Sequence, residues 1–417
     1  MTTLWLLLAC ATGQDSGFPD SLPVDSPPGS ADSQDSATVE QVGGVDPPEN
    51  PGPTKAELYD PLTVHTLALE LSQASLDALT LDEDSYVRAD LHFGGHVWPD
   101  VGVRLKGNSS RRTLVEKPAL KIKVHAFSPN QRFGEVERLT LNNNVNDPSM
   151  MAETLAYRTY RHAGSPGPRT GYASVTLNGV SLGLYTLVEA MDDEYVEDTW
   201  IDSTGTLYEP ARGCDLDDPI DCYSVDQAGE DHASDELQVV HDAAVSGDFD
   251  TLWQHVDEER VLAYLAAERF TAHEDSYSFN GNNHHLFFEP DGAQVSLSPW
   301  GADSTFVYRH PVDLAPGYAC ESMLEALGKT PTGLLAVRCG QDTGCTERLE
   351  TALLELASSV EAWDLDLFAA EVGVLLRPHA EIELRQGHSI QQFDDRVRCH
   401  QEWILARPDY VRAVLAE

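Results

Sequence analysis

The sequence predicts an α+β fold with a β-rich N-terminal lobe and a mostly helical C-terminal lobe. Residues 63–71, 86–93 and 97–105 alternate apolar and polar side chains, as half-buried β-strands do. Residues 346–417 instead carry apolar side chains at helical spacing. The chain has 417 residues, of which 41% are hydrophobic, and this is enough for a large core.

The β-rich lobe is expected over residues 58–190. Gly94-Gly95 marks a turn between two of its strands, and residues 119–124 form a further strand. Lys121 and Lys123 are two residues apart in that strand and therefore project from the same face.

A hairpin and a helix complete this lobe. Asn178-Gly179 is a strong two-residue turn signal, so a hairpin is predicted over residues 174–188. A helix is expected to start at Asp147, whose carboxylate would cap it, with Pro148 at the first helical position. Glu153 lies on this helix, from which it could pair with a strand lysine.

The helical lobe is expected over residues 191–417. Residues 237–271 are predicted to be largely helical. The C-terminal helical segment is expected to be interrupted near Pro378, because proline lacks the N–H that a helix interior needs.

The N-terminus indicates export. Residues 1–10 are a short apolar run that ends in Leu7-Leu8-Ala9-Cys10, which resembles the bacterial lipoprotein box in which the thiol of Cys10 is lipidated. Residues 11–57 are expected to form a disordered tether, because residues 11–54 contain eight prolines and eight acids but no basic residue. An exported lipoprotein, in the periplasm or at the cell surface, is the predicted location.

The net charge of −42 excludes one class of partner. With 69 acidic residues against 27 basic ones, the chain repels phosphate backbones and anionic lipid. Nucleic-acid binding is therefore not expected, and contact with a membrane is expected only through the lipid anchor.

Cysteine usage agrees with an oxidising compartment. Apart from Cys10 there are six cysteines, an even number that is compatible with three disulfides. They are Cys214, Cys222, Cys320, Cys339, Cys345 and Cys399. Proximity in the sequence favours the local pairs Cys214/Cys222 and Cys339/Cys345.

Two segments carry side chains suited to phosphoryl transfer. Asp275 is followed by Asn280, Asn283 and Asp303, and an acid ahead of amide and carboxylate oxygens is what Mg²⁺-dependent phosphoryl transfer requires. Upstream, the polar loop that contains Ser109 and Ser110 precedes the strand with Lys121 and Lys123. Backbone N–H groups and an ammonium in this order can bind a nucleotide phosphate.

The order of these parts resembles the spore-coat CotH kinase family. The resemblance covers residues 58–408, and the motifs that carry it are Gly107-Asn108-Ser109-Ser110-Arg111, residues 117–123, Leu139-Thr140-Leu141-Asn142, Leu177-Asn178-Gly179, Gly183-Leu184-Tyr185, Val188-Glu189, Gly205-Thr206-Leu207-Tyr208 and Trp300-Gly301-Ala302-Asp303. The resemblance implies an atypical protein-kinase-like fold that binds ATP with Mg²⁺ or Mn²⁺ and phosphorylates Ser or Thr of a protein substrate.

The resemblance also implies roles for the acid and amide side chains. Asp275 matches the catalytic aspartate, which orients the attacking hydroxyl or accepts its proton. Asp303 matches the metal-binding aspartate. Asn283 is favoured as the metal asparagine, and Asn280, five residues after Asp275, is kept as the alternative.

The nucleotide site has alternatives too. Lys121 or Lys123 is expected to hold the α- and β-phosphates, with Lys123 preferred, and Glu153 or Glu189 is its candidate partner.

Two residues depart from the family pattern. Many members have Asp where this chain has Gly301, and Lys where it has Glu209. An anion at Glu209 would repel phosphate. The alternative function is therefore a weak or inactive CotH-like surface lipoprotein that acts as a binding, adhesion or structural module.

Overall fold

The fold is described from a computed structural model, for residues 52–108, 110–227, 234–290, 294–306, 330–385 and 387–416. The chain divides between Glu49 and Asn50, and all described residues belong to the second unit, Asn50–Glu417. Cys10, which the sequence predicts to be lipidated, the loop residue Ser109 and Cys320 lie outside the described residues.

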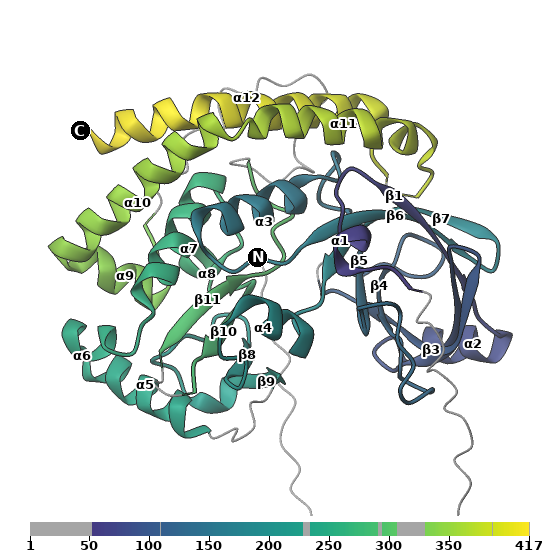
Figure 1. Ribbon diagram of the computed structural model, residues 1–417, viewed down its shortest axis with the longest axis horizontal. Coiled ribbons are helices and arrows are strands. Elements are labelled where there is room, and N and C mark those ends of the chain that lie inside the picture. The colour runs from purple at the N-terminus through teal and green to yellow at the C-terminus, as the bar shows by residue number, and fades with distance from the viewer. Residues whose placement is uncertain are drawn as a thin grey trace, which may run out of the picture. The chain divides into compact units, whose positions relative to one another are not determined.

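A closed seven-stranded barrel forms the N-terminal part of this unit (Figure 1). Its order is β1-β2-β3-β4-β5-β7-β6, and it closes through the parallel pair of β1 and β6, while the other pairs are antiparallel. Closure leaves the sheet without free edges. The strands are β1 (Val64–Glu70), β2 (Val87–Phe93), β3 (His96–Lys106), β4 (Ala119–Lys123), β5 (Arg138–Asn142), β6 (Thr170–Leu177) and β7 (Val180–Glu189).

Three helices accompany the barrel. Alternate residues of the strands, such as Val101, Val103 and Leu105 of β3, are buried in a core that is distinct from the core of the helical region. The helices are α1 (Lys55–Leu58), α2 (Gln73–Leu81) and α3 (Ala152–Ala163). α3 belongs to the second core, to which Leu155 and Tyr160 contribute, and so connects the barrel with the helical region.

The C-terminal part contains helices and a second sheet of order β11-β10-β8-β9. Its strands are β8 (Thr206–Pro210), β9 (Tyr223–Gln227), β10 (His284–Phe288) and β11 (Val295–Pro299). Its helices are α4 (Asp193–Thr199), α5 (Ser234–Ser246), α6 (Phe249–Trp253), α7 (Glu258–Thr271), α8 (Tyr277–Asn280), α9 (Leu334–Gln341), α10 (Thr343–Ala362), α11 (Leu365–Ile382) and α12 (Ile390–Leu415), with a 3₁₀ turn at Ile220–Cys222. No helix among the described residues is long and apolar enough to cross a membrane.

The predicted α+β class and the two local disulfides are confirmed. Cys214 and Cys222 are bonded with Cα atoms 6.2 Å apart, and Cys339 and Cys345 are bonded with Cα atoms 5.1 Å apart. The second sheet lies within residues 191–417, so this part is less uniformly helical than expected.

Two expected helix boundaries are wrong. α3 begins at Ala152 rather than after Asp147, because Met150 has a left-handed backbone with φ of 60°, which no α-helix accommodates. Asp147 still accepts a hydrogen bond from the N–H of Ala152 at 2.7 Å, so it caps the helix from a distance. Pro378 lies inside α11, which continues to Ile382, and the break falls between α11 and α12.

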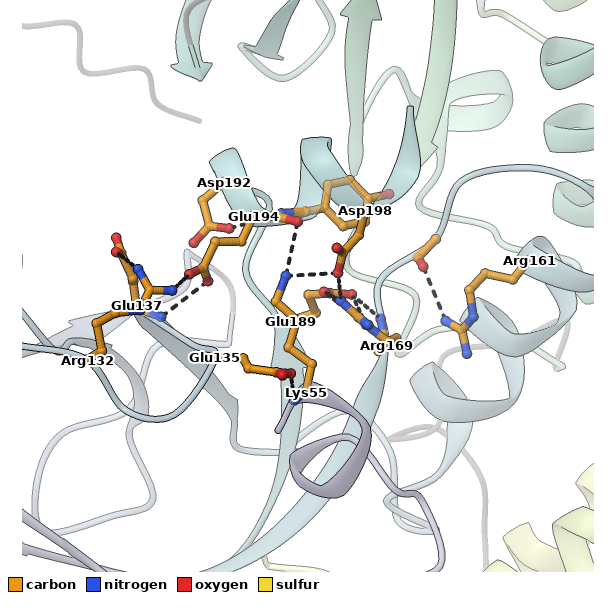
Figure 2. Close-up of polar contacts among 12 residues, drawn as sticks. Lys55, Arg132, Glu135, Glu137, Arg161, Arg169, Glu189, Asp192, Glu194 and Asp198 are labelled. Atoms are coloured by element: carbon orange, nitrogen blue, oxygen red, sulfur yellow. Dashed lines mark hydrogen bonds and ion pairs between the residues drawn. The ribbon is translucent and has the colours of Figure 1, made fainter. Parts of the chain in front are cut away.

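A network of charged groups fastens α1 and α4 to the end of the barrel (Figure 2). Lys55 of α1 lies 2.8 Å from the carboxylate of Asp198 and donates to the carbonyl of Glu194 at 3.1 Å. Arg169 binds both Glu189, at the end of β7, and Asp198. The network therefore spans the connection from the barrel to the second sheet.

A buried ion pair joins the barrel to the C-terminal helices. The ammonium of Lys117, which is fully buried, lies 3.0 Å from the carboxylate of Glu383, which follows α11. Glu383 also accepts a hydrogen bond from the N–H of Leu184 in β7 at 2.9 Å. Burial lowers the pKa of Lys117, and the carboxylate of Glu383 acts against this.

We expect Lys117→Met to reduce the free energy of unfolding by about 3–5 kcal/mol, because it leaves the Glu383 carboxylate buried without its cation. The double variant Lys117→Met/Glu383→Gln should recover much of this loss. Urea denaturation measures both. Arg377→Met is the matched control, because it breaks an exposed pair on α11, and it should cost far less. Equal losses of unfolding free energy in Lys117→Met and Arg377→Met would contradict a special stabilising role for the buried Lys117–Glu383 pair.

Candidate functional site

A cleft of about 410 Å³ collects the acid, amide and lysine side chains. It is bounded by the ends of β3 and β5, by α3 and by the loops around β10 and β11. Among its lining residues are Lys106, Ser110, Lys121, Asn146, Glu153, Asp275, Asn282, Asn283, Gly301 and Asp303. A second cavity of about 270 Å³ adjoins it and shares Arg104, Lys121, Glu209, His285 and Trp300 as lining residues.

Asp275 is held by three asparagine side chains. Its carboxylate accepts hydrogen bonds from the amides of Asn280, Asn282 at 3.0 Å and Asn283 at 2.9 Å. These amides return to Asp275 because α8 is a single turn that ends at Gly281, whose left-handed φ of 56° reverses the chain. The carboxylate is thus fixed in orientation and is only partly buried at the cleft surface.

Asp303 faces Glu153 across the cleft. Burial, followed by the charge of Glu153, raises the pKa of Asp303 to about 7. Burial likewise raises the pKa of Glu153, whereas hydrogen bonds donated by Asn142 at 2.6 Å and by Tyr157 at 3.1 Å act to lower it. The amide of Asn146 donates to Asp303 at 3.1 Å. Two carboxylates that oppose each other's ionisation provide a site that favours a cation.

Lys106 is a cleft residue that the sequence analysis missed. It ends β3, donates to the side-chain oxygen of Asn142 and lies 5.4 Å from the centre of the Trp300 ring. Burial lowers its pKa to about 8, while the charges of Glu153 and Asp303 oppose that shift. Period-two alternation along β3 could have identified it, because Arg104 and Lys106 share the face opposite to Val103 and Leu105.

The two predicted phosphate lysines are placed differently. Lys121 lines both the cleft and the adjoining cavity, whereas Lys123 lines only the cavity. The pairing of β3 with β4 explains this, since Lys121 is opposite Arg104 while Lys123 lies one step further from the cleft, opposite Gly102.

The two candidate partner acids are also separated. Glu153 lines the cleft and interacts with Lys106. Glu189 is instead bound by Arg169 in the network at the end of the barrel, and it lines a different, small cavity with Lys55 (Figure 2).

The two candidate metal asparagines differ in access to the cleft. Asn283 lines the cleft, while Asn280 is not among the described lining residues. Asn283 lies close to Gly301, where an added Cβ would come within 2.6 Å of its side-chain oxygen. Glycine at 301, with φ of 51°, therefore permits this close approach.

His273 links the two acid-bearing loops and was also missed. Its Nε2 is 3.3 Å from the carbonyl oxygen of Gly301, and its Nδ1 is 3.2 Å from the hydroxyl of Tyr160. Burial lowers its pKa to about 4, so the ring is neutral. The signal was its position two residues before Asp275, where a kinase catalytic loop carries histidine.

The donor set fits a divalent magnesium or manganese ion. Asp303 and Asn283 offer carboxylate and amide oxygens, which these hard cations prefer. The raised pKa of Asp303 is the observation that favours a cation there, because a nearby positive charge would relieve its repulsion with Glu153.

Comparison with known proteins gives one family and one curated relative. The family model described as CotH kinase protein matches residues 103–411, which include Lys106, Glu153, Asp275 and Asp303. Inner spore coat protein H of Bacillus subtilis (strain 168) is 21% identical over 202 residues, covering 43% of this chain and 53% of that protein. The chain thus spans about half the length of this relative.

We expect Asp303→Asn to stabilise the metal-free protein more at high pH than at low pH. The folded-state pKa of about 7 lies above the ordinary value of 3.8, so Asp303 contributes stability at low pH that is lost as the pH rises toward 7. Between about pH 5.5 and 8.5 the advantage of the variant should grow by roughly 1–2 kcal/mol.

Urea denaturation in the presence of a chelator measures this difference. Asp77→Asn, on the exposed side of α2, is the control, and its effect should not follow this pH dependence. A difference between wild type and Asp303→Asn that stays constant with pH would refute the expectation.

Proposed function

This chain belongs to the CotH kinase family, and we propose that it is a protein kinase that transfers the γ-phosphoryl group of ATP to Ser or Thr of a protein. The observation that carries the proposal is the gathering of Asp275, Asp303, Glu153 and Lys106 in one cleft. An acid for the acceptor, a metal-binding acid and a lysine–glutamate pair are the groups that kinase chemistry requires.

In this proposal Asp275 binds the acceptor side chain. Its carboxylate accepts a hydrogen bond from the Ser or Thr hydroxyl, whose oxygen then attacks the γ-phosphorus as the bond to the β,γ-bridging oxygen breaks. ADP leaves, and the proton of the hydroxyl passes to Asp275. The three asparagine amides keep the carboxylate in the orientation that this transfer needs.

The remaining groups act on the nucleotide. Asp303 and Asn283 would hold Mg²⁺ or Mn²⁺, which when bound offsets the negative charge of the phosphates. Lys106 donates a hydrogen bond to Asn142, and the charge of Glu153 favours its protonated form. Its ammonium would bind phosphate oxygens, and Lys121 on the neighbouring strand would contribute a second ammonium. Lys123, which lines only the adjoining cavity, is in this proposal a secondary contact.

The distribution of positive charge supports an anionic ligand. Only 27 residues of the chain are basic, yet six of them line the cleft or the adjoining cavity: Arg104, Lys106, Arg111, Lys121, Lys123 and Arg138. These six cations are matched by six acids in the same lining, Asp84, Glu153, Glu209, Asp226, Asp275 and Asp303, so the lining is far less negative than a chain of net charge −42 as a whole and can accept a phosphate. The adjoining cavity is also lined by Tyr86, Met191 and Trp300, whose apolar surfaces suit a nucleobase.

We further propose that the protein is exported and anchored by lipidation of Cys10. The two disulfides among the described residues support an oxidising compartment. Intact-mass measurement of the native protein would test the anchor.

We expect the full-length protein to transfer label from radiolabelled ATP to itself or to a Ser/Thr-rich protein when Mg²⁺ or Mn²⁺ is supplied. Asp275→Asn and Asp303→Asn should each reduce the rate by at least about 100-fold, because each removes a group that acts in the transition state. Asp217 is exposed and lies in the segment between Cys214 and Cys222, and Asp217→Asn should leave the rate unchanged. Transfer by wild type no faster than by Asp275→Asn, with both metals, would favour a non-catalytic binding module.

We expect Lys106→Met to weaken nucleotide binding by about 10-fold or more, which corresponds to losing a charged hydrogen bond. Lys123→Met should have a smaller effect, because Lys123 does not line the cleft that contains Asp303. Titration with a fluorescent ATP analogue compares the two variants directly. A larger loss in Lys123→Met than in Lys106→Met would reverse the assignment.

A further inference from the structure

Three side chains on neighbouring strands of the second sheet form a cluster apart from Asp275 and Asp303. Glu209 lies on β8, Asp226 on β9 and His285 on β10. One ligand atom from each lies within 4.8 Å of the others. All three line the 270 Å³ cavity, and Glu209 and His285 also line the cleft.

Sheet geometry explains why these side chains converge. Leu286 of β10 pairs with Tyr208 of β8 in antiparallel register. His285, which precedes Leu286, therefore lies opposite Glu209, which follows Tyr208. The pairing of β8 with β9 shifts register between Leu207, which pairs with Gln227, and Tyr208, which pairs with Val225, and this leaves Asp226 as an extra residue in β9. Such a bulge changes the direction of a side chain, and here it adds Asp226 to the same cluster.

One ring nitrogen of His285 has no hydrogen-bond partner among the described residues. This nitrogen is Nδ1, and the side chain is buried, with only 3% of the residue exposed. Its Nε2 lies 3.5 Å from a carboxylate oxygen of Asp226, and its ring meets Trp300 edge-on with centroids 5.8 Å apart. A buried imidazole with two carboxylates within 4.8 Å is a donor set that can coordinate a metal ion.

The charges of Lys121 and Arg138 act on Asp226 without forming an ion pair with it. Lys121 and Arg138 line the same cavity, but within the described part of the chain neither lies in an ion pair with Glu209 or Asp226. Arg138 is instead 3.9 Å from the carboxylate of Asp192. The two carboxylates therefore remain available to a ligand.

We infer that Glu209, Asp226 and His285 bind a divalent transition-metal ion, of which Zn²⁺ is the probe of choice. Two carboxylates and one imidazole suit Zn²⁺ or Mn²⁺ better than the all-oxygen coordination of Mg²⁺ or Ca²⁺, and three protein ligands leave a position open. A bound divalent ion neutralises the two carboxylates of Glu209 and Asp226. The site is complete without a nucleotide, so this inference stands apart from the proposed kinase activity.

The test is a titration of the full-length protein with Zn²⁺ in the absence of nucleotide, in competition with a chromophoric chelator. Wild type should bind one more equivalent than Glu209→Gln or His285→Gln, or bind it at least about 10-fold more tightly than either, because each variant removes a ligand atom. Asp303→Asn is the matched control and should retain this equivalent, since Asp303 is not a member of the cluster.

A second readout guards against misfolding. Glu209 is exposed, so Glu209→Gln should fold normally, and its thermal melting point without metal should equal that of wild type. Zn²⁺ should raise the melting point of wild type but not of Glu209→Gln. Equal Zn²⁺ binding by wild type and Glu209→Gln, or loss of the equivalent in Asp303→Asn alone, would overturn the inference, whereas absence of phosphoryl transfer would not affect it.

Discussion

The electrostatic interaction of the Lys106 ammonium with the carboxylates of Glu153 and Asp303 links the elements that form the cleft. It brings together the end of β3, helix α3 and the segment after β11, which are far apart in the sequence. Burial lowers the pKa of the lysine and raises the pKa of each acid, while the ammonium favours the ionised form of both acids and the acids favour the charged lysine. The attraction between the ammonium and the two acids offsets part of the cost of burying these charges, and it adds to the apolar contacts that hold α3.

The same use of scarce cations recurs at the contacts between the barrel and the rest of the unit. Lys117 joins the barrel to the end of α11, and Lys55 and Arg169 fasten the connection that leads to α4 (Figure 2). In a chain with 69 acidic and 27 basic residues, cations placed at internal contacts and around the cleft leave the remaining surface strongly negative. Solubility and the attraction of an anionic ligand can therefore coexist.

The family match and the structural unit have different limits. The family match begins at residue 103, inside β3, and therefore leaves out β1 and β2. These two strands belong to the barrel, because β1 closes it by pairing with β6 and β2 pairs with both β1 and β3. Residues 103–411 alone would leave two strands with unpaired edges. The segment from α1 to β2 is thus part of the same folding unit. The Glu209, Asp226 and His285 cluster likewise depends on pairing between strands, here of the second sheet.

The sequence by itself determined the α+β class, most barrel strands and the local disulfides, because strand alternation, turn signals and short cysteine spacing are local properties. It also proposed Asp275 and Asp303 as site residues, and both line one cleft. It did not identify Lys106 or His273 as cleft residues. It also left undecided whether Glu153 or Glu189 is the partner of the phosphate-binding lysine, and it kept Asn280 as the alternative to Asn283 for the metal. Those choices depend on which strands pair and where chain reversals occur, as the left-handed Met150 and Gly281 illustrate. Only the tertiary structure brings Lys106, Glu153 and Asp303 within electrostatic reach and assigns Glu189 to Arg169, because charge interactions act through space rather than along the chain.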